Sequence, residues 1–261
     1  MMANLIYLLG PAGSGKSTLT LGLLDTFESM DLDCATVNLD PGAEWLPYTP
    51  DVDIRKDISL TEVMRTYRLG PNGGLVAAID MLANHLPRLR EIIGGMNPDY
   101  VLVDTPGQME LFAFRETGPA IVKGLGEPRL TLFLADSFLS RSPCSFVSLL
   151  MLSTSVFVRF RTPQIIVLSK TDLLQSGELE RILDWWEDRE NLVEALQEEP
   201  QPLSRGTSLS LLQALQGSGL PGELVPVSCN TGQGLTELVS AIERAFSTET
   251  ELDLGKETGI V

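Results

Sequence analysis

The chain has 261 residues, 43% of them hydrophobic, which is enough to bury one large core. Its formal net charge of −16 repels a phosphate backbone and no basic cluster offsets it, so the composition argues against direct nucleic-acid binding. The three cysteines, Cys34, Cys144 and Cys229, lack metal-ligand spacing and predict reduced thiols, which suit a cytoplasmic protein.

Short apolar runs alternate with longer helical patterns along the chain. We expect strands over residues 4–10, 34–40, 100–107, 129–136, 164–170 and 224–230. We expect helices over 16–30, 57–69, 75–93, 109–126, 143–158, 178–198 and 234–246, with a further short helix near 208–216. This alternation predicts a doubly wound α/β domain whose sheet is mostly parallel and flanked by helices, with its chemistry at the carboxyl ends of the strands.

Two apolar stretches bear on membrane association. The run near the N-terminus has no basic residue before it and predicts a first strand rather than a signal peptide. The stretch 142–158 has no charge, but it is short, contains several serines and lies between Arg141 and Arg159. We interpret it as a buried or subunit-interface helix in preference to a membrane span, and we expect no membrane partner.

The string GPAGSGKS, residues 10–17, lies where an apolar strand ends and a helix begins. Glycines there let backbone N–H groups curl around a β-phosphate, and the start of the helix adds partial positive charge. In this pattern Lys16 bridges the β- and γ-phosphates and the Ser17 hydroxyl binds Mg²⁺. The expected phosphate-binding residues are Gly10, Pro11, Ala12, Gly13, Ser14, Gly15, Lys16, Ser17 and Thr18.

A second motif, DTPGQ over residues 104–108, follows another apolar strand. An acid at the end of such a strand, Asp104, can hold Mg²⁺ through water, and the Gly107 amide can meet a γ-phosphate. The Gln108 carboxamide can orient an attacking water, whereas Glu110 is a less specific candidate in the next helical turn. An Asx-type turn would explain Asp104 and Gly107, but it would not explain the whole string.

A third motif, SKTD, covers residues 169–172. Asp172 can accept hydrogen bonds from N1–H and the N2 amino group of guanine while the stem of Lys170 lies over the base, whereas adenine presents an acceptor at N1. The usual guanine signature begins with Asn, so Ser169 removes one carboxamide contact. A later strand ends in Ser228, Cys229 and Asn230, whose backbone amides can meet guanine O6, although many strands end this way.

Residues 70–74, Gly-Pro-Asn-Gly-Gly, interrupt a helical region. We expect an interhelical loop that is rigid at Pro71 and able to approach a phosphate closely at its glycines. Such a loop can present the Asn72 amide and backbone donors to a ligand. The alternative is a plain turn in which Asn72 caps the following helix.

Together, GPAGSGKST, NLDPGAE, GPNGG, DTPGQMELF and the K-x-D element resemble the GPN-loop GTPases over about residues 4–246. The resemblance implies a P-loop NTPase fold and hydrolysis of GTP to GDP and phosphate with Mg²⁺, in a dimer that we expect to be a homodimer. It implies that Gly70, Pro71 and Asn72 reach the partner's phosphates and that Asp40 lies near Mg²⁺ and the hydrolytic water. The expected catalytic residues are then Asp40, Gln108, Glu110, Asn72 and Lys16, and the expected metal ligands are Ser17, Asp40 and Asp104.

The same resemblance bears on organisation and role. We expect one GTPase domain over residues 1–247, with the GPN-loop insert at about 57–95, a helical insert at about 177–217 and a flexible acidic tail over 248–261. Eukaryotic members assist RNA polymerase assembly and transport, but the single short domain is more similar to the archaeal members. The client of this chain stays unknown.

Three other functions stay open. A small-molecule or nucleoside kinase usually needs an arginine-rich lid, which this sequence does not show, and it gives Asp172 no task. A dimerising ATPase of the related type needs a lysine early in the phosphate loop, where this chain has Pro11. A nucleotide-locked scaffold would bind the same ligand with little hydrolysis, and only kinetics separates it from an enzyme.

Overall fold

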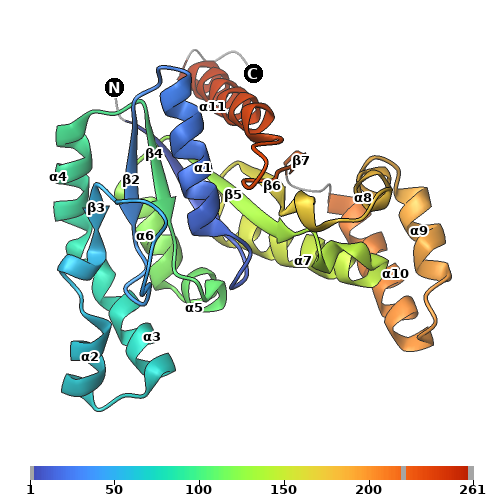
Figure 1. The fold of residues 1–261 in the computed structure, drawn as a ribbon, viewed down its shortest axis with the longest axis horizontal. Helices are drawn as coiled ribbons and strands as arrows, with labels where there is room; N and C mark the ends of the chain where they lie inside the picture. The colour runs from blue at the N-terminus through green and yellow to red at the C-terminus, as the bar shows by residue number, and fades with distance from the viewer. Residues whose placement is uncertain (1–2, 219–221, 258–261) are drawn as a thin grey trace.

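Seven parallel strands form one sheet in the part of the chain that the computed structural model describes, residues 3–218 and 222–257 (Figure 1). The strands are β1 Asn4–Leu9, β2 Cys34–Asn38, β3 Val52–Asp53, β4 Tyr100–Asp104, β5 Arg129–Asp136, β6 Gln164–Ser169 and β7 Leu224–Pro226. Their order is β3-β2-β4-β1-β5-β6-β7, with β1 paired to both β4 and β5. The predicted doubly wound α/β fold is confirmed.

Helices cover both faces of this sheet (Figure 1). They are α1 Lys16–Ser29, α2 Leu60–Tyr67, α3 Pro71–Leu82, α4 Leu86–Met96, α5 Met109–Ala113, α6 Thr117–Leu125, α7 Pro143–Phe160, α8 Glu178–Glu187, α9 Arg189–Gln197, α10 Pro202–Ser218 and α11 Leu235–Glu257. Short 3-10 turns lie at η1 Ile54–Lys56, η2 Ala83–His85, η3 Leu139–Arg141 and η4 Thr171–Leu173.

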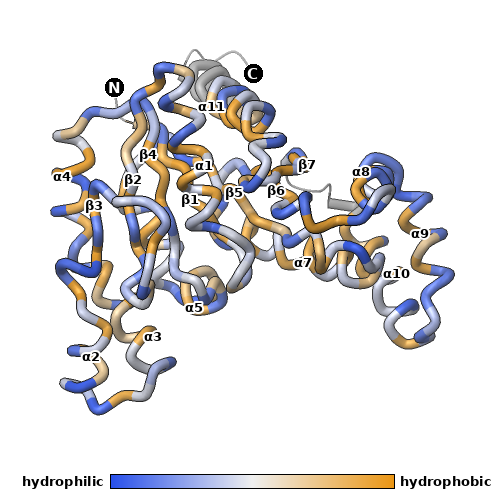
Figure 2. Tube along the Cα trace, in the orientation of Figure 1, coloured by the Kyte–Doolittle hydropathy of each residue, from blue (hydrophilic) through white to orange (hydrophobic). Residues whose placement is uncertain are grey.

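Alternation along β1 divides the core into two layers. Ile6 and Leu8 pack in a cluster with side chains of α1 and α11, whereas Tyr7 and Leu9 belong to a larger cluster on the opposite face. Because successive side chains of a strand point to opposite faces, a strand buried on both sides reads as a continuous apolar run. Figure 2 shows hydrophobic residues concentrated along these central strands.

Helix boundaries around the Gly-Pro-Asn-Gly-Gly string correct our expectation of an interhelical loop. Gly70 is the N-cap of α3, and Pro71 is its first residue, where a missing N–H costs no hydrogen bond. Asn72 therefore lies inside the first helical turn and does not cap it. Gly74 allows α2 and α3 to approach, because a Cβ there would lie 2.4 Å from Cγ of Met64.

Other boundaries also differ from the sequence pattern. Strand β3 was not expected, since two residues carry no periodicity. The expected helix over 178–198 breaks at Asp188, whose side chain accepts a hydrogen bond from the Glu190 amide and begins α9. Helix α10 is longer than the short helix expected near 208–216, and α11 continues to Glu257 beyond the expected end at 246. Residues 258–261 lie outside the described part of the chain.

Helix α7 accounts for the uncharged stretch over 142–158. Within the described residues it is the one helix that is long and apolar enough to cross a membrane, and 39% of it is buried inside the protein. Its buried side chains include Phe146, Val147 and Leu150, which belong to the larger core cluster. We therefore assign α7 to the core of the domain.

Candidate nucleotide-binding site

The loop between β1 and α1 has a backbone geometry suited to binding phosphates. Gly13 and Gly15 have φ angles of 77° and 96°, a left-handed conformation that favours glycine, and Gly15 is the N-cap of α1. A Cβ on Gly10 would lie 2.7 Å from the carbonyl oxygen of Leu134, so the loop also needs glycine where it crosses β5. The loop thus presents backbone N–H groups at a helix N-terminus.

The ammonium group of Lys16 lies inside this loop. Its Nζ donates to the carbonyl oxygens of Gly10 at 2.9 Å, Pro11 at 3.2 Å and Gly107 at 3.4 Å. Burial lowers the pKa of Lys16, and nearby carboxylates, first among them Asp104, act in the opposite direction. A cation held by three carbonyl dipoles is placed to exchange them for phosphate oxygens.

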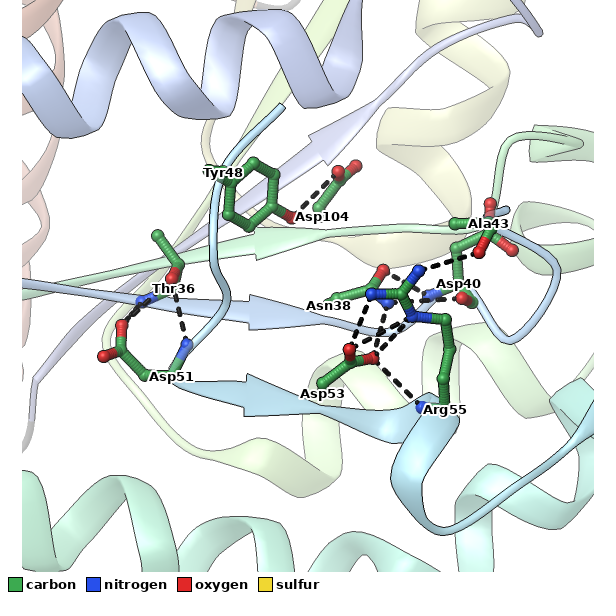
Figure 3. A network of polar contacts seen from close by, with 9 residues as sticks. All are labelled: Thr36, Asn38, Asp40, Ala43, Tyr48, Asp51, Asp53, Arg55 and Asp104. Carbon is green, nitrogen blue, oxygen red and sulfur yellow. Dashed lines mark hydrogen bonds and ion pairs between the residues drawn. The ribbon is translucent and has the colours of Figure 1, made fainter. Parts of the chain in front are cut away.

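Asp104 ends β4 beside the phosphate loop and is 1% exposed. Its Oδ2 accepts a hydrogen bond from the Tyr48 hydroxyl at 3.0 Å (Figure 3). Its Oδ1 is buried and has no hydrogen-bond partner among the described residues. Burial raises the pKa of Asp104 to about 6, although the Ser17 and Tyr48 hydroxyls and Lys16 act in the opposite direction. Since an unpaired buried carboxylate oxygen is costly, the site fits a cation as its missing partner.

The same donor set favours Mg²⁺ bound together with a nucleotide. No cluster of three or more His, Cys, Asp or Glu side chains suited to a metal occurs in residues 3–218 and 222–257. Mg²⁺ is commonly held by one or two protein oxygens, with phosphates and waters completing its octahedron. The Asp104 carboxylate and the Ser17 hydroxyl provide such oxygens.

Asp40, which we expect to lie near Mg²⁺ and the hydrolytic water, lies beside Gly107. Both of its carboxylate oxygens accept backbone N–H groups at 2.8 Å, Oδ1 from Gly42 and Oδ2 from Gly107. The Gly107 amide is the group that the sequence suggested for a γ-phosphate. Asp40 therefore lies at the edge of the phosphate site, and in this arrangement both of its carboxylate oxygens are hydrogen-bonded to backbone amides.

A polar network fixes the segment that carries Asp40 (Figure 3). The Asn38 side chain bridges the Asp40 backbone and the Asp53 carboxylate, which it reaches at 2.9 Å. Arg55 forms a two-pronged ion pair with Asp53 and donates to the Ala43 carbonyl oxygen at 2.9 Å. Through these contacts Arg55 holds the segment after β2 against the end of the edge strand β3.

Gln108 and Glu110 follow Gly107 at the start of α5. The Gln108 side chain is half-buried and makes no hydrogen bond to the described residues. Glu110 is exposed in the first turn of α5 and is close enough to raise the pKa of Lys16. Both predicted residues thus lie on the segment next to the phosphate loop.

A pocket of about 160 Å³ opens beside the phosphate loop and is lined by Ser14, Gly15, Thr18, Leu19, Ser169, Lys170, Asp172, Leu173, Val227, Cys229 and Asn230. The Asp172 carboxylate is fixed in it by the Ser228 hydroxyl at 2.7 Å and the Asn230 side-chain amide at 2.9 Å. These bonds, the Ser228 one first, lower the pKa of Asp172 and keep it an acceptor. Ser228 and Asn230 thus act through their side chains on Asp172, which was not expected.

Ser169 and Lys170 connect this pocket to the phosphate loop. The Ser169 hydroxyl donates to the carbonyl oxygen of Ser14 at 2.8 Å, so it ties the end of β6 to the phosphate loop. The Lys170 ammonium pairs with Asp136 at 2.7 Å, which fixes the lysine stem across the pocket. Asp136, at the end of β5, was not singled out in the sequence, although its position after an apolar strand was a usable signal.

The tip formed by Gly70, Pro71 and Asn72 lies elsewhere. These residues are exposed, and the Asn72 side chain has no hydrogen-bond partner in the described chain. The tip lies at the end of the α2–α3 pair, away from the phosphate loop of the same chain (Figure 1). The base of α3 is joined to the segment after Gly107, because Asp80 accepts hydrogen bonds from Arg115 and Thr117.

Comparisons with known proteins identify relatives that are similar over most of the chain. A family model described as "Conserved hypothetical ATP binding protein" matches residues 8–248. GPN-loop GTPase 3 from Dictyostelium discoideum is 32% identical over 94% of this chain and 87% of the relative. GPN-loop GTPase 2 from Xenopus tropicalis is 35% identical over 95% of this chain and 84% of the relative. GPN-loop GTPase 1 from D. discoideum is 31% identical, and the chain spans 60% of its length.

A solved structure has the same fold over nearly its full length. The crystal structure of a GTPase in its apo form from Pyrococcus abyssi superposes with a TM-score of 0.84 and 30% identity. The match covers 94% of this chain and 98% of the archaeal one. The resemblance that the motifs indicated is therefore confirmed, and the chain belongs to the GPN-loop GTPase family.

Proposed function

We propose that this protein binds GTP with Mg²⁺ and hydrolyses it to GDP and phosphate, as a homodimer in which each subunit's Asn72 acts at the partner's nucleotide. The observation that supports GTP most directly is the Asp172 carboxylate, fixed by Ser228 and Asn230 in a pocket beside the phosphate loop. Membership of a family of GTPases supports the same reaction.

Asp172 provides the preference for guanine. A carboxylate held by two donors on one side accepts the N1–H and N2 amino protons of guanine on the other, whereas adenine offers an acceptor at N1. The matched family model is described as ATP-binding. In our proposal ATP is the weaker ligand, because its base leaves the Asp172 carboxylate unpaired.

The triphosphate is held by the loop over residues 10–18. Lys16 releases its three carbonyl oxygens and donates to the β- and γ-phosphates. Ser17 and Asp104 would hold the Mg²⁺, which would supply positive charge beside the phosphates. The γ-phosphate accepts the Gly107 N–H, and Asp40 then leaves that amide and moves toward the attacking water with Gln108. Glu110, on the same segment and close to Lys16, is a further candidate catalytic residue.

Asn72 completes the site from the partner. The tip of α2–α3 is exposed and does not reach its own phosphate loop, which favours action between subunits. An amide brings hydrogen bonds without a positive charge, so its contribution is positioning and modest stabilisation of the transition state. We further propose a cytoplasmic protein whose partners are the nucleotide, its own second copy and an unidentified client, with no nucleic acid or membrane.

Mixing two impaired variants tests this proposal. Asn72→Ala has an intact nucleotide site but lacks the amide that acts on the partner. Lys16→Ala has that amide but an impaired nucleotide site. If each Asn72 acts across the dimer, mixed dimers contain one complete site, and GTP hydrolysis rises on mixing. If Asn72 acts within its own subunit or has no role, the mixture stays at the mean of the two separate variants. A GTPase that acts as a monomer fails the test in the same way, and solution mass with a non-hydrolysable GTP analogue identifies that case.

A further inference from the structure

Tyr48 is a buried residue at the site that none of the sequence motifs indicated. It lies between β2 and β3, is 7% exposed and donates its hydroxyl to Oδ2 of Asp104 at 3.0 Å. The contact joins two segments that are 56 residues apart in the chain. Figure 3 shows the ring turned from its loop toward the end of β4.

The chain on either side of Tyr48 is pinned to β2. Before it, the Asp40 amide donates to Oδ1 of Asn38 at 3.0 Å. After it, Oδ2 of Asp51 accepts the Thr36 amide at 2.8 Å and the Thr36 hydroxyl at 2.9 Å. Because the segment that carries Tyr48 is bonded to the buried strand β2 at both of its ends, the position of the tyrosine hydroxyl is well defined.

The Tyr48 hydroxyl makes the two oxygens of the Asp104 carboxylate different. Oδ2 is taken by Tyr48, whereas Oδ1 is buried and has no partner among the described residues. Without the tyrosine hydroxyl, the carboxylate would be free to turn and present either oxygen. Groups that bind a metal ligand from behind set its orientation in this way.

We infer that Tyr48 is a positioning residue for Asp104 that fixes Oδ1 toward the Mg²⁺ of the bound nucleotide. The inference rests on the proposed function, because it needs Mg²⁺ to bind with the nucleotide at Asp104. It makes Tyr48 part of metal binding even though its own hydroxyl does not touch the ion.

The test measures how much Mg²⁺ is needed for a fluorescent GDP analogue to bind. Tyr48→Phe keeps the ring and removes the hydroxyl. The matched control is Tyr7→Phe, since Tyr7 is also buried in the sheet and its hydroxyl donates to the Val122 carbonyl oxygen at 3.2 Å. The same proteins are titrated with the analogue in EDTA, and their melting temperatures are recorded without Mg²⁺.

We expect Tyr48→Phe to need about tenfold more Mg²⁺ for half-maximal binding, the usual effect of losing a partner of a metal ligand. Its nucleotide affinity in EDTA stays at the wild-type value, and Tyr7→Phe keeps the wild-type Mg²⁺ requirement while losing some thermal stability. This pattern separates positioning of the ligand from a general loss of a buried hydrogen bond.

Two results would overturn the inference. An unchanged Mg²⁺ requirement in Tyr48→Phe means that Asp104 is oriented without the tyrosine. Equal shifts in Tyr48→Phe and Tyr7→Phe mean that the hydroxyl is only structural. A wild-type protein that binds the analogue equally well with and without Mg²⁺ is a different failure, because it removes the link between Mg²⁺ and nucleotide binding that the proposed function contains.

Discussion

The Asp40 carboxylate accepts a hydrogen bond from the Gly107 amide at 2.8 Å and so joins the segments that follow β2 and β4. In the proposed reaction the same amide serves the γ-phosphate. Two anionic oxygens repel each other at that distance, so in that reaction a triphosphate would displace Asp40 from Gly107 whereas a diphosphate would leave the contact in place. Under the proposed function, the contact would therefore give the protein a physical means to distinguish GTP from GDP.

Replacement of Asp40 tests its part in hydrolysis. Asp40→Ala should slow single-turnover GTP hydrolysis by about 10²-fold, because a positioned acid or base typically contributes that much. The melting temperature should change little, since only two hydrogen bonds at a half-buried side chain are lost. Hydrolysis at the wild-type rate would remove Asp40 from the site and leave the Gly107 contact as a purely structural link.

Replacement of Lys16 tests the phosphate loop. Lys16→Ala should weaken GTP binding by about tenfold to a hundredfold, the range for lost hydrogen bonds from a charged donor, and it should reduce turnover as well. The control is Lys123→Ala, which changes an exposed lysine of α6. Equilibrium titration with a fluorescent GTP analogue gives both affinities, and a normal affinity in Lys16→Ala would contradict its phosphate role.

Base recognition is tested by competition between nucleotides. Wild-type protein should bind GTP at least about tenfold more tightly than ATP, the discrimination expected of one well-placed polar pair. Asp172→Ala should bring the two affinities together. Asn230→Ala should weaken the preference less, because Ser228 still holds the carboxylate. Equal competition by ATP and GTP at the wild-type protein would exclude the guanine assignment.

The buried carboxylate of Asp104 gives a prediction for stability. Its pKa of about 6 lies above the ordinary value of 3.8, so the folded protein binds this proton more tightly than the unfolded chain. The contribution to stability is therefore fully present below about pH 4 and is lost as the pH rises through about 6. The difference corresponds to at most about 3 kcal/mol.

Asp104→Asn removes this titration. Without nucleotide, the variant should be more stable than the wild-type protein at pH 7, and the advantage should vanish near pH 4. The Mg²⁺ dependence of nucleotide binding should weaken in the same variant. Denaturant unfolding across this pH range measures the effect, and parallel stability curves for the two proteins would show that the pKa of Asp104 is the same in the folded and unfolded states.

The parts of the site that depend on local geometry were predictable from sequence. The glycines and Lys16 of the phosphate loop act within one strand-turn-helix unit, so their spacing alone identifies them. Tyr48 was not predictable in this way, since the sheet brings its partner Asp104 near. Asp136 had only its position after an apolar strand as a signal, because its partner Lys170 follows a neighbouring strand. The Gly-Pro-Asn-Gly-Gly string was misread as a loop because Pro71 also suits the first position of a helix and Gly74 serves close packing of α2 on α3.

The bonds from Asp80 to Arg115 and Thr117 have a consequence for communication between the two subunits of the proposed dimer. They link the helix that carries Asn72 to the chain that follows Gly107. If Gly107 moved toward a terminal phosphate, this link would carry part of the movement to α3. In the proposed dimer, nucleotide binding in one subunit would therefore influence the position of the amide that this subunit offers to its partner.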